Sequence, residues 1–148
     1  MDRDELEGYE REIAALLTIW GVGSVIKGGA IAIIGRRIGR RQWMHFGRQT
    51  AMWGAVDALI AGVGTLSRSR RGELTQEEVD FEAVKLRTML LLNAAADVAY
   101  IAGGAHIAVR AGRDGTSFRM TRGDGIAIVI QGAFLLALDA VYARKLST

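Results

Sequence analysis

The sequence predicts an all-α protein, a bundle of four transmembrane helices built from two tandem helix hairpins. Three observations support this fold: four long apolar runs, small residues that recur every seven positions within them, and arginines gathered at the ends of the runs. Half of the residues are hydrophobic, 19 are glycine, and proline and cysteine are absent. The absence of cysteine excludes a disulfide framework and a thiolate metal site.

The four apolar runs have the length of membrane spans. At about 1.5 Å per residue in a helix, each covers roughly 27–33 Å, close to the thickness of the hydrocarbon core. A water-soluble bundle would need a polar face on every helix. The first run lacks one, because only Thr18, Ser24 and Lys27 interrupt its apolar and small residues. We expect a multi-pass protein of the cell membrane. The runs are residues 13–34, 49–66, 88–109 and 125–143.

The helices extend beyond some of these runs. Thr75 to Glu78 has the pattern of a capping box, with Leu74 and Val79 at the positions of a hydrophobic staple, so the third helix begins well before the membrane. Asp124 is expected to cap the fourth helix. We expect a single membrane domain over residues 1–148, with helices at about 4–35, 48–67, 75–110 and 124–144.

Two arginine-rich connections, 36–48 and 110–124, fall on one side of the membrane, and the 67–87 connection falls on the other with both termini. Lysine and arginine are equally numerous on the two sides, so the positive-inside rule leaves the orientation open. The first twelve residues are acidic and do not have the pattern of a secretory signal peptide.

Small residues line one face of each expected helix. A period of seven keeps one seam against a neighbouring helix in a left-handed bundle, and helices in lipid associate through such close packing. An internal repeat is also indicated, since Gly47 to Gly54 resembles Gly125 to Gly132 and the Gly-Gly-Ala of 28–30 recurs at 103–105. The seam residues are Gly21, Gly28, Gly35, Gly47, Gly54, Ala61, Ala96, Gly103, Gly125 and Gly132.

Polar residues at membrane depth form the candidate site. A charge at the centre of a span costs about 2.5–3.5 kcal/mol on insertion scales, so such side chains should face inward and pair. We expect Lys27 to pair with Asp57 or Asp97, and Asn93 to bond Asp139. A proton, ion or small-ligand site and a purely structural set of interhelical contacts both remain open. The candidates are Lys27, Asp57, Asn93, Asp97, Tyr100, Gln131 and Asp139.

Other sites have less support. His45 and His106 fall on the same side of the membrane and are the only candidates for haem ligation, but two lone histidines are more simply interfacial residues, and we expect no cofactor and no metal. Trp20 and Trp53 are expected to be packing residues. The net charge is +3, but the arginines form no continuous face, which argues against nucleic-acid binding.

From Leu17 to Tyr142 the chain resembles an uncharacterised family of small bacterial four-helix membrane proteins. The resemblance rests on three segments, and it implies the fold and the membrane location but no activity. The family favours Asn where Asp57 stands, and Lys27 is peculiar to this chain, which points to a local structural variation at that level. The segments are Trp53 to Asp57 with Ile60 to Gly62, Asn93 with Asp97 to Tyr100, and Gln131 to Leu136 with Asp139.

No catalytic motif is present, so we expect a non-enzymatic accessory or ligand-binding bundle with a polar inner level. The first alternative is a small oligomeric transporter or channel for protons, ions or a small polar solute, and the second is a haem-binding electron carrier. Besides the lipid bilayer, the expected partners are further copies of the chain or a larger membrane complex. A single four-helix bundle has little room for a water-filled path, so transport would favour a homo-oligomer.

Overall fold

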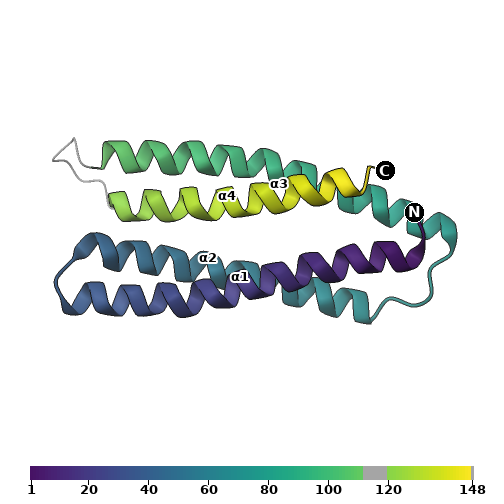
Figure 1. Ribbon diagram of the computed structural model, residues 1–148, viewed down its shortest axis with the longest axis horizontal. Coiled ribbons are helices and arrows are strands. Elements are labelled where there is room, and N and C mark those ends of the chain that lie inside the picture. Colours follow the sequence, from purple (N-terminus) through teal and green to yellow (C-terminus); the bar gives the residue numbers. More distant parts are fainter. Residues whose placement is uncertain (112–119, 148) are drawn as a thin grey trace.

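The computed structural model describes residues 1–111 and 120–147. Its four helices are α1 (Arg3–Arg37), α2 (Arg41–Ser69), α3 (Gln76–Arg110) and α4 (Arg122–Lys145). All four are long and apolar enough to cross a membrane, and the two described segments contain no strand. The all-α prediction of two tandem hairpins is confirmed: α1 packs on α2, and α3 packs on α4. Both termini lie at the end where α2 connects to α3 (Figure 1).

The start of α2 corrects one prediction. We expected an arginine-rich connection over 36–48, but α2 already begins at Arg41. Gly39 makes the turn with a φ of 68°, a conformation that suits glycine, and the Arg40 amide donates to the Gly35 carbonyl at 2.8 Å. The residues that follow include Arg, Gln and Met, which favour helix, so most of the expected connection is helical.

The helix starts depend on capping side chains. Thr75 and Glu78 form the predicted capping box, and Val79 is buried in a cluster that Leu74 packs against. In α4 the cap is Thr121, so the assignment of the cap to Asp124 was wrong. Asp124 closes that box from inside the helix, with Oδ2 accepting from the Thr121 amide at 2.6 Å. The chain enters α4 earlier than expected because Thr121 itself supplies the extended cap residue.

Glycines determine how closely the backbones of α1 and α2 approach each other in the first hairpin. A methyl group on Gly28 would lie 2.6 Å from both the Gly47 carbonyl oxygen and the Ala51 nitrogen, and one on Gly54 would lie 2.6 Å from the Gly21 carbonyl oxygen. These distances are shorter than any ordinary contact, so only glycine permits the backbones to approach in this way. The predicted seam between α1 and α2 is confirmed.

The second hairpin has the same kind of seam with a shifted register on α3. Gly125 faces the Gly104 carbonyl oxygen and the Ala108 nitrogen, each 2.5 Å from the position of a methyl group. The prediction of Ala96 and Gly103 in this seam was wrong, because both are exposed. Gly103 and Gly104 are adjacent glycines, so the sequence alone did not show which of them packs on the neighbouring helix. Gly104 is the one that faces α4, and Asp97 rather than Ala96 is buried one heptad before it.

The two hairpins meet mainly through α2 and α4, and α1 and α3 scarcely touch. α4 is accordingly the central helix: 39% of its most apolar segment is buried, against 17% in each of the other three helices. Much of the surface of α1, α2 and α3 within the apolar spans therefore faces outward, as suits helices surrounded by lipid.

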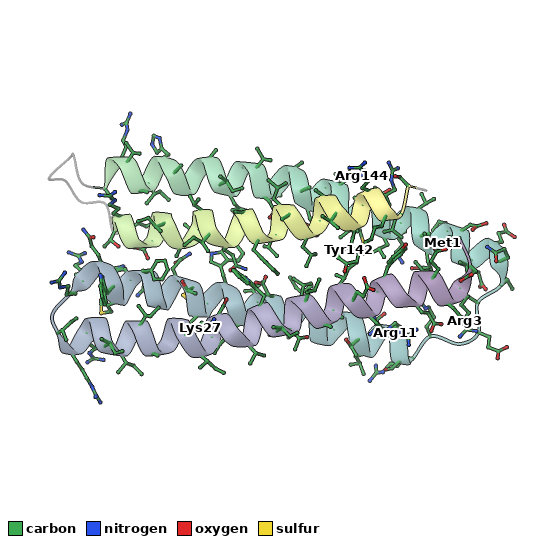
Figure 2. The ribbon with its side chains drawn as sticks, viewed as in Figure 1. Met1, Arg3, Arg11, Lys27, Tyr142 and Arg144 are labelled. Atoms are coloured by element: carbon green, nitrogen blue, oxygen red, sulfur yellow. The ribbon has the colours of Figure 1, made fainter. Side chains whose placement is uncertain are left out.

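The end with the termini resembles a water-soluble bundle. Leu6 and Val79 are completely or almost completely buried there. Charged contacts surround them: Arg71 binds Glu10 through two hydrogen bonds of 2.5 and 3.1 Å. In Figure 2 the labelled Arg3, Arg11 and Arg144 gather at this end, far from Lys27. The prediction that α1 and α3 begin beyond the apolar spans fits this arrangement.

Glu12 gives this end a testable pH response. The Tyr142 hydroxyl donates to Glu12 at 2.9 Å, and this bond and Lys145 lower the pKa of Glu12. A carboxylate whose pKa is lowered by folding stabilises the fold above its ordinary pKa, and this contribution is lost as the pH falls through the lowered value. We therefore expect Glu12→Gln to be slightly less stable than the wild type at neutral pH, with the difference vanishing in acid. Thermal unfolding followed by circular dichroism checks this, and a difference that persists unchanged in acid would contradict it.

Candidate functional site

A chain of polar side chains, buried on α2 and α4 and half-buried on α1, joins three helices. The Trp20 indole N–H of α1 donates to the Gln131 Oε1 of α4 at 2.9 Å. The Gln131 Nε2 in turn donates to Asp57 Oδ2 on α2. Gln131 is 4% exposed and Asp57 is 2% exposed. The amide thus satisfies a carboxylate and an indole that would otherwise be unpaired in an apolar interior.

Two further carboxyl groups extend this chain of polar side chains, and we call the whole set the polar level. Asp97 of α3 and Asp139 of α4 are 4% and 5% exposed, and their side chains lie within hydrogen-bonding distance of each other. Asp57 is near enough to Asp97 for their charges to interact. We call Asp57, Asp97 and Asp139 the carboxylate cluster. It includes one residue from each of α2, α3 and α4, so it lies where the two hairpins meet.

The predicted pairing of Lys27 with Asp57 or Asp97 was wrong. In the two described segments Lys27 forms no ion pair, and its side chain is exposed on α1. The buried positions of α1 on either side of Lys27 are Ser24 and Gly28, which places Lys27 off the line that faces α2, while Asp57 takes its hydrogen bond from the Gln131 amide. The cluster therefore has an amide where we expected an ammonium group.

The predicted bond between Asn93 and Asp139 was also wrong. Asn93 is exposed, and the partner of Asp139 is Asp97, which faces it across the α3–α4 interface. Tyr100 is 46% exposed, and its ring meets the Trp53 ring edge-on at 5.3 Å. Asn93 and Tyr100 are thus peripheral to the cluster, whereas Asp57, Asp97, Gln131 and Asp139 come together as one level.

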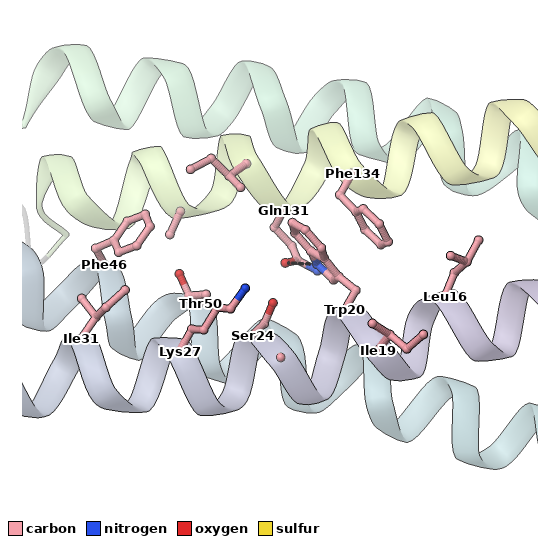
Figure 3. Close-up of a pocket in the computed structure, with 13 residues that line it drawn as sticks. Leu16, Ile19, Trp20, Ser24, Lys27, Ile31, Phe46, Thr50, Gln131 and Phe134 are labelled. Carbon is pink, nitrogen blue, oxygen red and sulfur yellow. Dashed lines mark hydrogen bonds between the residues drawn. The ribbon is translucent and has the colours of Figure 1, made fainter.

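Two cavities reach the ends of this polar level. One, which we call the groove, has a volume of about 370 Å³, lies between α1, α2 and α4, and is bordered by Lys27 and Gln131. Figure 3 shows Lys27 extending into it and Gln131 bonded to Trp20 beside it. The other, which we call the cleft, has a volume of about 190 Å³ and is bordered by Asp139, Asn93 and Glu10.

The histidines occupy different surroundings. His45 is buried, and its Nδ1 lies 3.0 Å from Asp124 Oδ2, although the two groups are not aligned for a hydrogen bond. This contact connects the start of α2 to the start of α4. His106 is exposed on α3, so haem ligation gains no support and stays a prediction. Residues 1–111 and 120–147 contain no group of His, Cys, Asp or Glu suited to a metal ion.

Trp20 has a part in the polar level that we did not expect. We expected Trp20 to be a packing residue, and it does stack on Phe134, with ring centroids 3.9 Å apart. Its indole N–H is nevertheless the donor that orients Gln131. A signal was available, because a tryptophan inside a protein usually finds a hydrogen-bond partner for this group, and Gln131 was one of the polar residues expected at membrane depth.

Comparison with known proteins gives a family but no activity. The model of a family of unknown function, DUF6992, matches residues 16–140. No curated protein and no solved structure matches the chain.

Proposed function

The chain belongs to this family of unknown function, and we propose that it is a non-enzymatic multi-pass membrane protein that binds a proton in its carboxylate cluster. Membrane residence is supported by four helices of sufficient length and apolarity. The sequence led us to expect a ligand-binding bundle without naming the ligand, and the proposal specifies a proton. The proposal rests on one observation, the buried contact between Asp97 and Asp139.

Two carboxyl groups can share a hydrogen bond only if one of them is protonated, because two carboxylates have acceptors and no donor. Asp97 and Asp139 lie within that distance, and in the described part of the chain no cation pairs with either. Two adjacent buried negative charges would be costly in an apolar interior. The pair is therefore suited to hold one proton.

Proton loss should act on the packing of the hairpins. Asp97 and Asp139 join α3 to α4, and Asp57 extends the cluster to α2, at the contact between the hairpins. A second negative charge in this level would repel its neighbours across both interfaces. The protein would then respond to pH by loosening, a behaviour that suits an accessory subunit of a larger membrane complex.

Replacing Asp97 by asparagine tests the proposal. The amide is permanently neutral and keeps a hydrogen-bond donor for Asp139. In detergent, the wild type should lose stability as the pH rises, because the shared proton is removed. Asp97→Asn should lose much less over the same range. Thermal unfolding as a function of pH measures both.

Asp80→Asn is the matched control, since Asp80 is an exposed aspartate of the same helix. It should follow the wild-type pH profile. If wild-type stability does not fall with rising pH, or if Asp97→Asn falls equally steeply, the cluster does not hold a proton.

Proton transport is a second candidate, favoured by the positions of the cavities. The groove reaches Gln131 and the cleft reaches Asp139, so both ends of the polar level border open space. A path through that level would connect them by way of Asp97. Liposomes with an imposed pH gradient test this. Asp139→Asn should abolish any proton flux that the wild type shows, and the absence of proton flux in the wild type would contradict a role in transport.

A further inference from the structure

The groove has the composition of a site for an amphiphile. Its surface is mostly apolar, and a small number of polar groups lie together on the α1 and α2 side. Ligand sites in proteins commonly combine apolar surface with a few such groups that orient the ligand. The apolar lining residues include Leu16, Ile19, Ile31, Phe46, Ile130 and Phe134.

Lys27 gives the groove its charge. The residue lies within the first apolar span, and in the described segments no carboxylate pairs with it. Figure 3 shows its amine extending between Ser24 and Thr50. Ser24 is 7% exposed, and both hydroxyl residues border the groove. An ammonium group at this depth is costly unless an anion accompanies it, and the protein supplies two hydroxyl groups beside it rather than an acid.

One side of the groove is rigid. The Trp20 and Phe134 rings are stacked with an angle of 6° between their planes, and the Trp20 N–H is fixed by Gln131. Both residues border the groove. An acyl chain could lie along these rings without having to order them first, which lowers the entropic cost of binding.

Depth and volume restrict the anion. With the midplane expected at the centre of the first apolar run, residues 13–34, the backbone of Lys27 lies within roughly 5 Å of it at about 1.5 Å per residue. This position is about 10 Å below the boundary of a hydrocarbon core about 30 Å thick. A phospholipid phosphate belongs at that boundary, whereas the carboxylate of a single-chain acid can move deeper. The volume of about 370 Å³ corresponds to on the order of a dozen non-hydrogen atoms at about 30 Å³ each.

We propose that the groove binds a fatty acid, with its carboxylate at the Lys27 amine and at the Ser24 and Thr50 hydroxyl groups, and that the part of the acyl chain that exceeds the volume of the groove extends into the surrounding lipid. Its acyl chain lies along Trp20 and Phe134. This site is separate from the carboxylate cluster, and its occupancy does not require the cluster to bind a proton.

Trp20 provides the measurement. In a Trp43→Phe, Trp53→Phe background it is the remaining tryptophan, since the chain has three. Brominated fatty acid bound in the groove quenches its fluorescence by contact. In phosphatidylcholine vesicles, half-quenching should need about tenfold less brominated acid than brominated alcohol of equal length. This factor is at the lower end of the gain in affinity that a hydrogen bond to a charged group provides.

Variants of Lys27 show whether the preference has the proposed origin. Lys27→Met should remove the difference between acid and alcohol, and Lys27→Arg should keep it. Removing an unpaired charge from a span should not impair folding, and an unchanged circular dichroism spectrum checks this. Equal quenching by acid and alcohol in the wild type, or a preference that survives in Lys27→Met, would overturn the proposal. So would equal quenching by brominated phosphatidylcholine, which would mean that bulk lipid fills the groove.

Discussion

Gly28→Ala is expected to destabilise the protein by roughly 1–3 kcal/mol, the usual cost of overpacking an interior. The added methyl group would lie 2.6 Å from the Gly47 carbonyl oxygen and the Ala51 nitrogen. Both are backbone atoms of α2, so they cannot rotate away as a side chain could. The clash is relieved only if α1 and α2 separate along their seam. Thermal unfolding in a mild detergent measures the loss.

Gly29→Ala is the matched control, because a methyl group on Gly29 would meet nothing within 4 Å. Alanine has the higher helix propensity by about 1 kcal/mol, so this variant should be as stable as the wild type or slightly more stable. The same contrast should appear between Gly104→Ala and Gly103→Ala in the second hairpin. Equal losses in Gly28→Ala and Gly29→Ala would show that the seam is not where the structure places it.

Gln131→Leu is the second variant with a large expected effect. It removes the amide that donates to Asp57 and accepts from Trp20. An unsatisfied buried polar group costs about 1–3 kcal/mol, and a charged one costs more. Since Asp57 is 2% exposed, water cannot replace the lost donor without opening the bundle. The difference in thermal stability between variant and wild type measures this cost.

A double variant separates the lost hydrogen bonds from the change in packing. Adding Asp57→Leu to Gln131→Leu removes the buried carboxylate that has lost its donor, and should recover the part of the lost stability that comes from Asp57, while the Trp20 N–H stays without the Gln131 acceptor. Asn93→Leu replaces another amide within the membrane span, but Asn93 is exposed, so no loss is expected. If the double variant loses the sum of the two single losses, Gln131 and Asp57 do not depend on each other.

The fold was predictable because long apolar runs and period-seven glycines impose strong geometric requirements. Four runs of membrane length need four helices, and the glycines of α1 and α2 define their common seam. The α3 seam was shifted by one residue, because the prediction followed the small residues Ala96 and Gly103, whereas the line that is buried on α3 includes Asp97 and Gly104. The start of α2 was missed because charged side chains suggested a loop, whereas arginine is a good helix former.

The candidate site was predictable in composition but not in pairing. Asp57, Asp97, Gln131 and Asp139 were expected from their polarity at membrane depth, and all four are buried. Depth along a helix does not determine rotation about its axis, so depth alone could not give the partner of Lys27, and the predicted pairing with Asp57 or Asp97 was wrong. Asp139 likewise has Asp97 as its neighbour rather than Asn93, because the helix faces that meet are set by packing at the glycines.

Infrared spectroscopy of the protein in liposomes tests most directly whether the cluster holds a proton in the membrane. At neutral pH the wild type should show the C=O stretching band of a protonated carboxylic acid, which should disappear as the pH is raised. The band should be absent or displaced in Asp97→Asn and Asp139→Asn and unchanged in Asp80→Asn. A wild-type spectrum with carboxylate bands alone at neutral pH would contradict the account.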